Sequence, residues 1–103
     1  MVGPAVECVN GTKIWYIDDK IHRTDGPAIE YANGDKEWYI DGKRHRADGP
    51  AIEYINNVRE WYINNVLHRI DGPAVEYAIG YKEWYVAGIK QSDNKICTKI
   101  NTL

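Results

Sequence analysis

Apolar and aromatic residues alternate with polar ones in short segments of the chain, and Gly, Asn and Asp separate these segments. "PAIEY" at 27–31 and "KEWYI" at 36–40 show the pattern. Both segments are rich in aromatic and β-branched residues, as expected of half-buried strands. No segment combines an apolar period of 3.6 residues with helix caps. The pattern therefore predicts an all-β protein.

The same two segments recur along the chain at a fixed interval. The tryptophans stand 23 residues apart, at positions 15, 38, 61 and 84, and "HRTDGPAIEY" from His22 returns in similar form from His45 and His68. A constant period of this size indicates a repeat array in which each unit stacks on the next. We assign residues 1–103 to a single domain, with units at 1–21, 22–44, 45–67 and 68–90 and a C-terminal cap at 91–103.

Each unit is predicted to form a hairpin closed by a two-residue turn. Asn33-Gly34 is a strong signal for such a turn, because both residue types adopt positive φ readily. A two-residue turn would pair Glu30 with Glu37. It would also divide the side chains between two faces, with Ile29, Tyr31, Trp38 and Ile40 on one and Ala28, Glu30, Glu37 and Tyr39 on the other.

A second turn, at Asp41-Gly42, gives the repeated His-Arg pair a structural interpretation. It places His45 opposite Trp38, so we expect each His to stack on a Trp and each Arg to neutralise a pair of glutamates. The residues assigned to this structural ladder are Trp15, Trp38, Trp61, Trp84, His22, His45, His68, Arg23, Arg46 and Arg69.

Together these features predict an elongated, twisted antiparallel β-meander of about eight to ten strands, with one hairpin per unit. An irregular strand around residues 95–100 is expected to close it. A single sheet has two faces and two edges, and this chain is too short to cover its own aromatic face. We therefore expect a homodimer, or docking to a partner.

The repeat as a whole, "HRxDGPAxEYxxGxKEWYxxGxx", resembles the MORN-like repeats encoded by bacteriophages and large DNA viruses. The resemblance covers about residues 3–90 and implies a 23-residue β-hairpin repeat. The usual MORN opening "YxGxxxxGxxHGxG" is not present, because "HR" and "DGP" stand in its place. The membrane and phospholipid roles of some MORN proteins are therefore not carried over.

Charge and composition give little indication of a partner. The chain has 13 basic and 15 acidic residues, and no run of five like charges. We therefore expect neither nucleic acid nor a membrane as its partner. The start "MVGPAVECV" has no secretory pattern, so we expect a protein of the host-cell cytoplasm in which Cys8 and Cys97 are free thiols.

The repeated acids and histidines could suggest catalysis or metal binding. Glu30 and Glu37 would form a carboxylate dyad, but equivalent pairs recur in later units, and a catalytic site needs one organised centre. His22 and Asp25 also recur, with no Ser or Cys nucleophile nearby. We therefore expect no enzyme activity, no cofactor and no metal.

The predicted function is a protein–protein interaction module of viral or phage origin. The resemblance to viral MORN-like arrays implies that it would bind, and inhibit, a host protein such as a bacterial immune effector. The candidate partner-binding residues break the repeat at hairpin tips with apolar side chains, and they are Ile55, Ile79 and Tyr81. The alternative is an aromatic-ladder platform that binds a glycan or a nucleotide.

Overall fold

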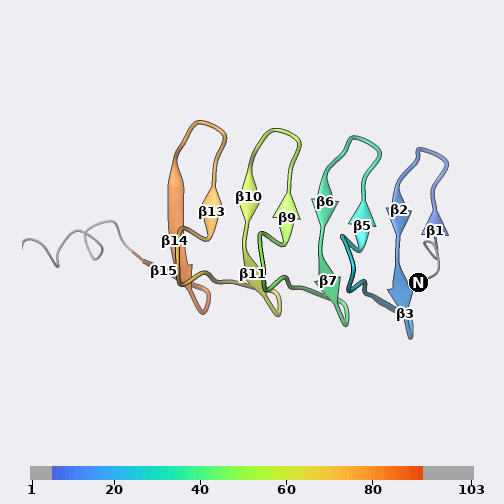
Figure 1. Cartoon of the computed structure of the whole chain (residues 1–103), viewed down its shortest axis with the longest axis horizontal. Coiled ribbons are helices and arrows are strands. Elements are labelled where there is room, and N and C mark those ends of the chain that lie inside the picture. Colours follow the sequence, from blue (N-terminus) through green and yellow to red (C-terminus); the bar gives the residue numbers. More distant parts are fainter. Residues whose placement is uncertain (1–5, 92–103) are drawn as a thin grey trace, which may run out of the picture.

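The computed structural model describes residues 6–91, which form a row of four β-hairpin units with no helix among them (Figure 1). Nine strands form one open antiparallel sheet in the order β1-β2-β5-β6-β9-β10-β13-β14-β15. The pairs β3-β4, β7-β8 and β11-β12 form three small sheets. The predicted all-β meander of consecutive hairpins is confirmed.

The strands are short, and each unit repeats the same series. Their bounds are β1 (Val6–Glu7), β2 (Lys13–Ile14), β3 (Tyr16–Ile17), β4 (Lys20–Ile21), β5 (Ile29–Glu30), β6 (Lys36–Glu37), β7 (Tyr39–Ile40), β8 (Lys43–Arg44), β9 (Ile52–Glu53), β10 (Arg59–Glu60), β11 (Tyr62–Ile63), β12 (Val66–Leu67), β13 (Val75–Glu76), β14 (Lys82–Val86) and β15 (Ile89–Gln91). The expected strand around residues 95–100 lies outside the described residues.

In each unit the segment that contains the tryptophan, such as residues 36–40, changes its pairing partner at that tryptophan. In the second unit β6 pairs with β5 of the same unit and with β9 of the next one. Beyond Trp38, β7 pairs with β8. The backbone N–H of Trp38 donates to the carbonyl of Ala51, 2.7 Å away, and this bond also joins the second unit to the third. The hairpins therefore stand side by side along the row (Figure 1).

The hairpin loop has three residues, and this corrects the predicted register. The N–H of Tyr31 donates to the carbonyl of Asp35, and Gly34, with φ of +101°, closes the loop in a left-handed conformation. Glu30 therefore lies opposite Lys36, and Glu37 lies opposite Ile29. The extra loop residue moves every later side chain to the other face of the sheet.

Two faces result, and each differs from its prediction. Trp38 shares its face with Glu30 and Lys36, and we call this the tryptophan face. Glu37 and Tyr39 lie with Ile29 and Tyr31 on the tyrosine face. The predicted grouping of Trp38 and Ile40 with Ile29 and Tyr31 was wrong.

The second turn follows the prediction. Tyr39 lies opposite Arg44 and Ile40 opposite Lys43, so Asp41 and Gly42 form a two-residue turn. Both have positive φ, +51° and +78°, as a type I′ turn requires. Equivalent turns with two positive φ values lie at Asp18-Asp19, Asn64-Asn65 and Ala87-Gly88.

The core is thin: one short row of buried side chains lies on each face of the sheet, and Trp15 is buried as well. Ala28, Ala51 and Ala74 are fully buried, and Ile29, Ile52 and Val75 are also buried. A core of this size gives modest hydrophobic stabilisation, so polar contacts between units carry weight in holding the array together.

Cys8 is exposed and forms no disulfide within residues 6–91, whereas Cys97 lies outside them. No helix in the described part of the chain is long and apolar enough to cross a bilayer.

Candidate functional site

Much of the repeated phrase "HRxDGPAxE" surrounds a single arginine. The guanidinium carbon of Arg46 lies 3.9 Å from the centre of the Trp38 ring system. Its Nε donates to Asp48 at 3.0 Å, and its Nη1 donates to the carbonyl of Pro50 and to the carboxylate of Glu53, both at 3.1 Å. The arginine therefore joins the tryptophan of one unit to the first strand of the next.

The glycine of the phrase leaves room for this arginine. A Cβ on Gly49 would lie 2.9 Å from the guanidinium carbon of Arg46, which is closer than real side chains allow. The same arrangement recurs at Arg23, 3.8 Å over Trp15, and at Arg69, 3.9 Å over Trp61. It is arginine, and not histidine, that covers each of these indoles. The predicted role of Arg in neutralising a pair of opposed glutamates was wrong, because Glu30 lies opposite Lys36 and not opposite Glu37.

The histidines hold the second turn of their own unit instead of covering an indole. Nδ1 of His22 accepts a hydrogen bond from the backbone N–H of Asp41 at 2.9 Å. His45 and His68 accept equivalent bonds from the N–H groups of Asn64 and Ala87. Nδ1 must be unprotonated to accept these bonds. The predicted stacking of His on Trp is replaced by this contact within each unit.

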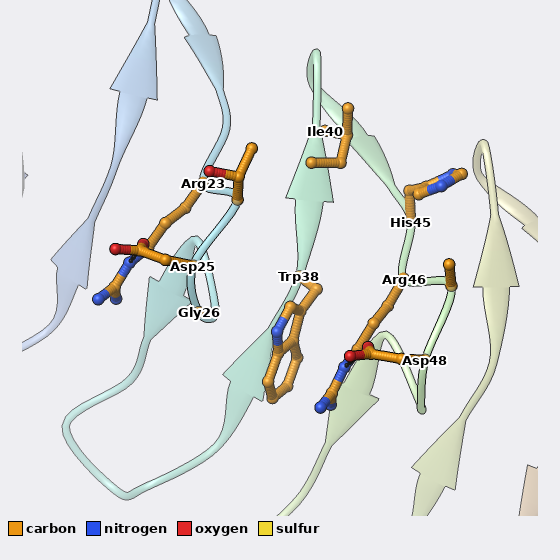
Figure 2. Close-up of a pocket in the computed structure, with 10 residues that line it drawn as sticks. Arg23, Asp25, Gly26, Trp38, Ile40, His45, Arg46 and Asp48 are labelled. Atoms are coloured by element: carbon orange, nitrogen blue, oxygen red, sulfur yellow. Dashed lines mark hydrogen bonds and ion pairs between the residues drawn. The ribbon is translucent and has the colours of Figure 1, made fainter. Parts of the chain in front are cut away.

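Two equivalent hollows lie on the tryptophan face between neighbouring turns. The first has a volume of about 640 Å³ and is lined by Arg23, Asp25, Trp38, Ile40, His45 and Asp48 (Figure 2). The second lies one unit further along and includes Trp61, His68 and Asp71. The arginines that line them are already bonded to carboxylates and carbonyls, so the hollows present apolar walls and carboxylates to solvent.

The tyrosine face carries a cluster that the sequence analysis missed. The side chain of Glu37 is buried and accepts hydrogen bonds from the hydroxyls of Tyr31 at 3.1 Å and Tyr39 at 2.9 Å. Burial, together with the charge of Glu37, raises the pKa of Tyr31 to about 12. Glu60 and Glu83 accept similar bonds from Tyr62 and Tyr77. The predicted register concealed this cluster because it placed Glu37 and Tyr31 on opposite faces.

Arg44 distinguishes the second unit from the others on this face. Its guanidinium carbon lies 6.0 Å from the ring centre of Tyr39 and 5.5 Å from that of Tyr62, and its Nε lies 3.8 Å from a carboxylate oxygen of Glu37. The other units have Ile21, Leu67 and Lys90 at this position. Arg44 therefore bridges the aromatic rows of two consecutive units, and its departure from the repeat is the one signal in the sequence that could have found it.

The carboxylate pairs weighed as catalytic dyads do not form. Glu30 lies on the tryptophan face opposite Lys36 and accepts a bond from Arg23, whereas Glu37 lies on the tyrosine face. The same separation holds for the equivalent residues of the third and fourth units. Within residues 6–91, no group of three or more His, Cys, Asp or Glu side chains is arranged to hold a metal ion.

The three candidate partner-binding residues all lie at hairpin tips and are exposed. Ile79 is 90% exposed, Ile55 61% and Tyr81 51%. Ile55 also packs on the preceding hairpin, because its Cγ2 lies 2.8 Å from where a Cβ on Gly34 would stand. Around the neighbouring Gly80 the space is open, and the ring of Tyr81 contacts only that of Tyr77 among the described aromatic pairs, with centres 5.5 Å apart. The tips line one long edge of the row (Figure 1).

The ladder residues, by contrast, lie inside the array. Trp15 is buried, and Trp38, Trp61 and Trp84 are half-buried along the row of units. Arginines from the following linkers cover the first three of these indoles.

Comparison of the chain with protein-family models, with curated proteins and with solved structures finds no match.

Proposed function

We propose that the chain is a non-enzymatic protein-binding module whose partner contacts the hairpin tip of the fourth unit. The observation that carries the proposal is an exchange at this tip. In the second unit, Asn33 accepts a hydrogen bond from the N–H of Asp35 and donates one to its carboxylate. The fourth unit has Ile79 and Tyr81 at these positions, and both are exposed.

This exchange weakens the turn without adding to the core. An asparagine at the tip accepts the N–H two residues onward in each of the first three units, and isoleucine has no group that can do so. Ile79 stays 90% exposed after folding and Tyr81 51%, so neither side chain is part of the core. Apolar and aromatic side chains of this kind provide much of the binding energy of protein interfaces.

The arrangement of the tryptophans favours a protein over a small ligand. Glycans and bases stack on free aromatic faces. An arginine covers a face of Trp15, Trp38 and Trp61, and each of these arginines is held by carboxylates and a carbonyl. A glycan or nucleotide that stacked on the covered face of these indoles would have to displace these contacts.

The resemblance of the repeat to MORN-like arrays of bacteriophages and large DNA viruses indicates which partners to test first. We propose a protein of the host cytoplasm, such as a bacterial immune effector, which the module would bind and inhibit. The absence of a run of like charges is consistent with a partner recognised mainly by apolar contacts.

The test gives the hairpin tip of the fourth unit the residues found at the tip of the second unit. The double variant Ile79→Asn, Tyr81→Asp is compared with the parent in pull-downs from lysates of candidate hosts, followed by calorimetry with the captured protein. The matched control is Ile70→Thr, because Ile70 is 75% exposed and the second unit has Thr24 at this position. We expect binding to be lost in the tip variant and kept in the control. Capture of the same partner by the tip variant, or of none by the parent, would overturn the proposal.

A further inference from the structure

A row of alternating charges crosses the tryptophan face from one end of the sheet to the other. Each residue of the row lies directly opposite the next one in the strand register, and residues that face each other in this way share a face of the sheet. The row consists of Glu7, Lys13, Glu30, Lys36, Glu53, Arg59, Glu76 and Lys82. It begins with an acid on β1 and ends with a base on β14.

The three junctions between units are built in the same way. At each of them a basic residue on the second strand of one unit faces an acidic residue on the first strand of the next, in the pairs Lys13–Glu30, Lys36–Glu53 and Arg59–Glu76. A backbone bond from Trp to Ala accompanies each pair, with lengths of 2.9, 2.7 and 2.8 Å. A junction therefore joins a basic edge to an acidic edge in a fixed register.

The two ends of the sheet carry the unmatched halves of this junction. Among the described strands, β1 pairs only with β2, and the Lys82–Glu83 part of β14 pairs only with β13. The edge of β1 presents Glu7, which is exposed, and the edge of β14 presents Lys82, which is also exposed. An unpaired strand edge is a template for pairing with another chain.

We propose that these ends join between copies of the chain, so that β14 of one copy pairs with β1 of the next and Lys82 faces Glu7. A second copy fits because its edge has the charge and the register of the internal charge pairs, although the sequence has Ser92 where the internal junctions have an arginine. The two edges lie at opposite ends of the row (Figure 1), so the contact is heterologous and produces linear head-to-tail assemblies. The proposal does not depend on a host partner.

Charge reversal at the two ends tests this arrangement. The sedimentation of the full chain is measured over a range of concentrations, alongside Glu7→Lys and Lys82→Glu. The parent is expected to associate as its concentration rises, and each variant is expected to do so roughly tenfold more weakly, because like charges then meet at the junction. Rising salt is also expected to weaken the association of the parent, because the pair of Lys82 and Glu7 is exposed and salt screens their attraction.

An equimolar mixture of the two variants separates this proposal from its alternatives. In the mixture, the lysine introduced at position 7 meets the glutamate introduced at position 82, and the native Lys82 meets the native Glu7. Association is therefore expected to return to the parental level, which loss of folding in either variant could not produce. Lys36→Glu serves as the control, since it disturbs an internal junction and is expected to lower stability while leaving association unchanged.

Three outcomes would overturn the proposal. A parent that stays monomeric at every concentration would show that the two edges do not join. A dimer that neither single reversal weakens would place the contact elsewhere on the molecule. A mixture that does not regain association would exclude the head-to-tail pairing of β14 with β1.

Discussion

The guanidinium of Arg46 lies over the indole ring of Trp38, 3.9 Å from its centre, and the same guanidinium is bonded to Glu53 in the next unit. This side chain therefore connects the second and third units, as Arg23 and Arg69 connect the units at either side. Because each unit touches only its neighbours, the stability of the array depends on such contacts between units. The role of the repeated phrase is thus architectural.

Replacing the arginine with lysine should destabilise the fold although the charge is kept. Lysine cannot stack a planar group on Trp38 while donating in three fixed directions. We expect Arg46→Lys to lower the free energy of unfolding by about 2 kcal/mol, measured by urea denaturation. Arg59→Lys is the matched control, because the other units have lysine at that position, and it should change the free energy by less than about 0.5 kcal/mol. Equal losses in both variants would contradict the special role of Arg46.

The glycine beneath the arginine should also be sensitive to a single methyl group. The Cβ of Gly49→Ala would lie 2.9 Å from the guanidinium carbon of Arg46, so the arginine must move off its partners. We expect a loss of roughly 1–3 kcal/mol in urea denaturation. In an Arg46→Ala background the same change should cost much less, because the clash is gone. Additive losses in this double-mutant cycle would show that the glycine is needed for another reason.

Two glycines at hairpin tips allow the effect of backbone strain to be separated from the effect of side-chain packing. Gly34 and Gly80 have similar positive φ values of +101° and +92°, so alanine is strained at both. Only at Gly34 would the new Cβ also meet Ile55, at 2.8 Å. We therefore expect Gly34→Ala to lower the melting temperature more than Gly80→Ala does. If Ile55→Ala removes that difference, the packing of one hairpin tip on the next accounts for it, and an unchanged difference would argue against this account.

The buried glutamate of the tyrosine face predicts a specific response to high pH. The pKa of Tyr31 is raised to about 12, first by burial and then by Glu37, above its ordinary value of about 10. The stabilisation that this phenol provides is thus fully present below pH about 10 and is lost as the pH rises through about 12.

Glu37→Gln removes the charge and keeps the burial. The pKa of Tyr31 should therefore fall while staying above its ordinary value. NMR titration of ring-labelled tyrosine measures the pKa, and Tyr31→Phe assigns the signal. Asp19→Asn is the control, because Asp19 is exposed in the second turn of the first unit, and it should leave the pKa of Tyr31 unchanged. A Glu37→Gln variant with the parental pKa would mean that burial alone raises it.

Much of the fold could be predicted from residue types and spacing. The tryptophan period indicated the repeat, and Asp41-Gly42 indicated a two-residue turn that the structure contains. Asn33-Gly34 was misleading, because this pair can close a loop of two residues or end a loop of three. In the register that forms, Glu37 meets Tyr31 and Tyr39, and Glu30 meets Lys36. Tyr31 and Glu30 reach their partners across the hairpin, and local turn preference does not take such contacts into account.

The sequence by itself determined that the chain is an all-β array of hairpins and that positions such as Ile79 break its repeat. Tertiary structure alone decided which side chains meet across the first loop of each unit and between units. A shift of one residue in the loop moves a whole strand's side chains to the opposite face, so the tyrosine face and the charge row followed only from the strand register. The contacts of Arg46 likewise come from Trp38 and Glu53 in separate units, which only the packing of consecutive units brings together.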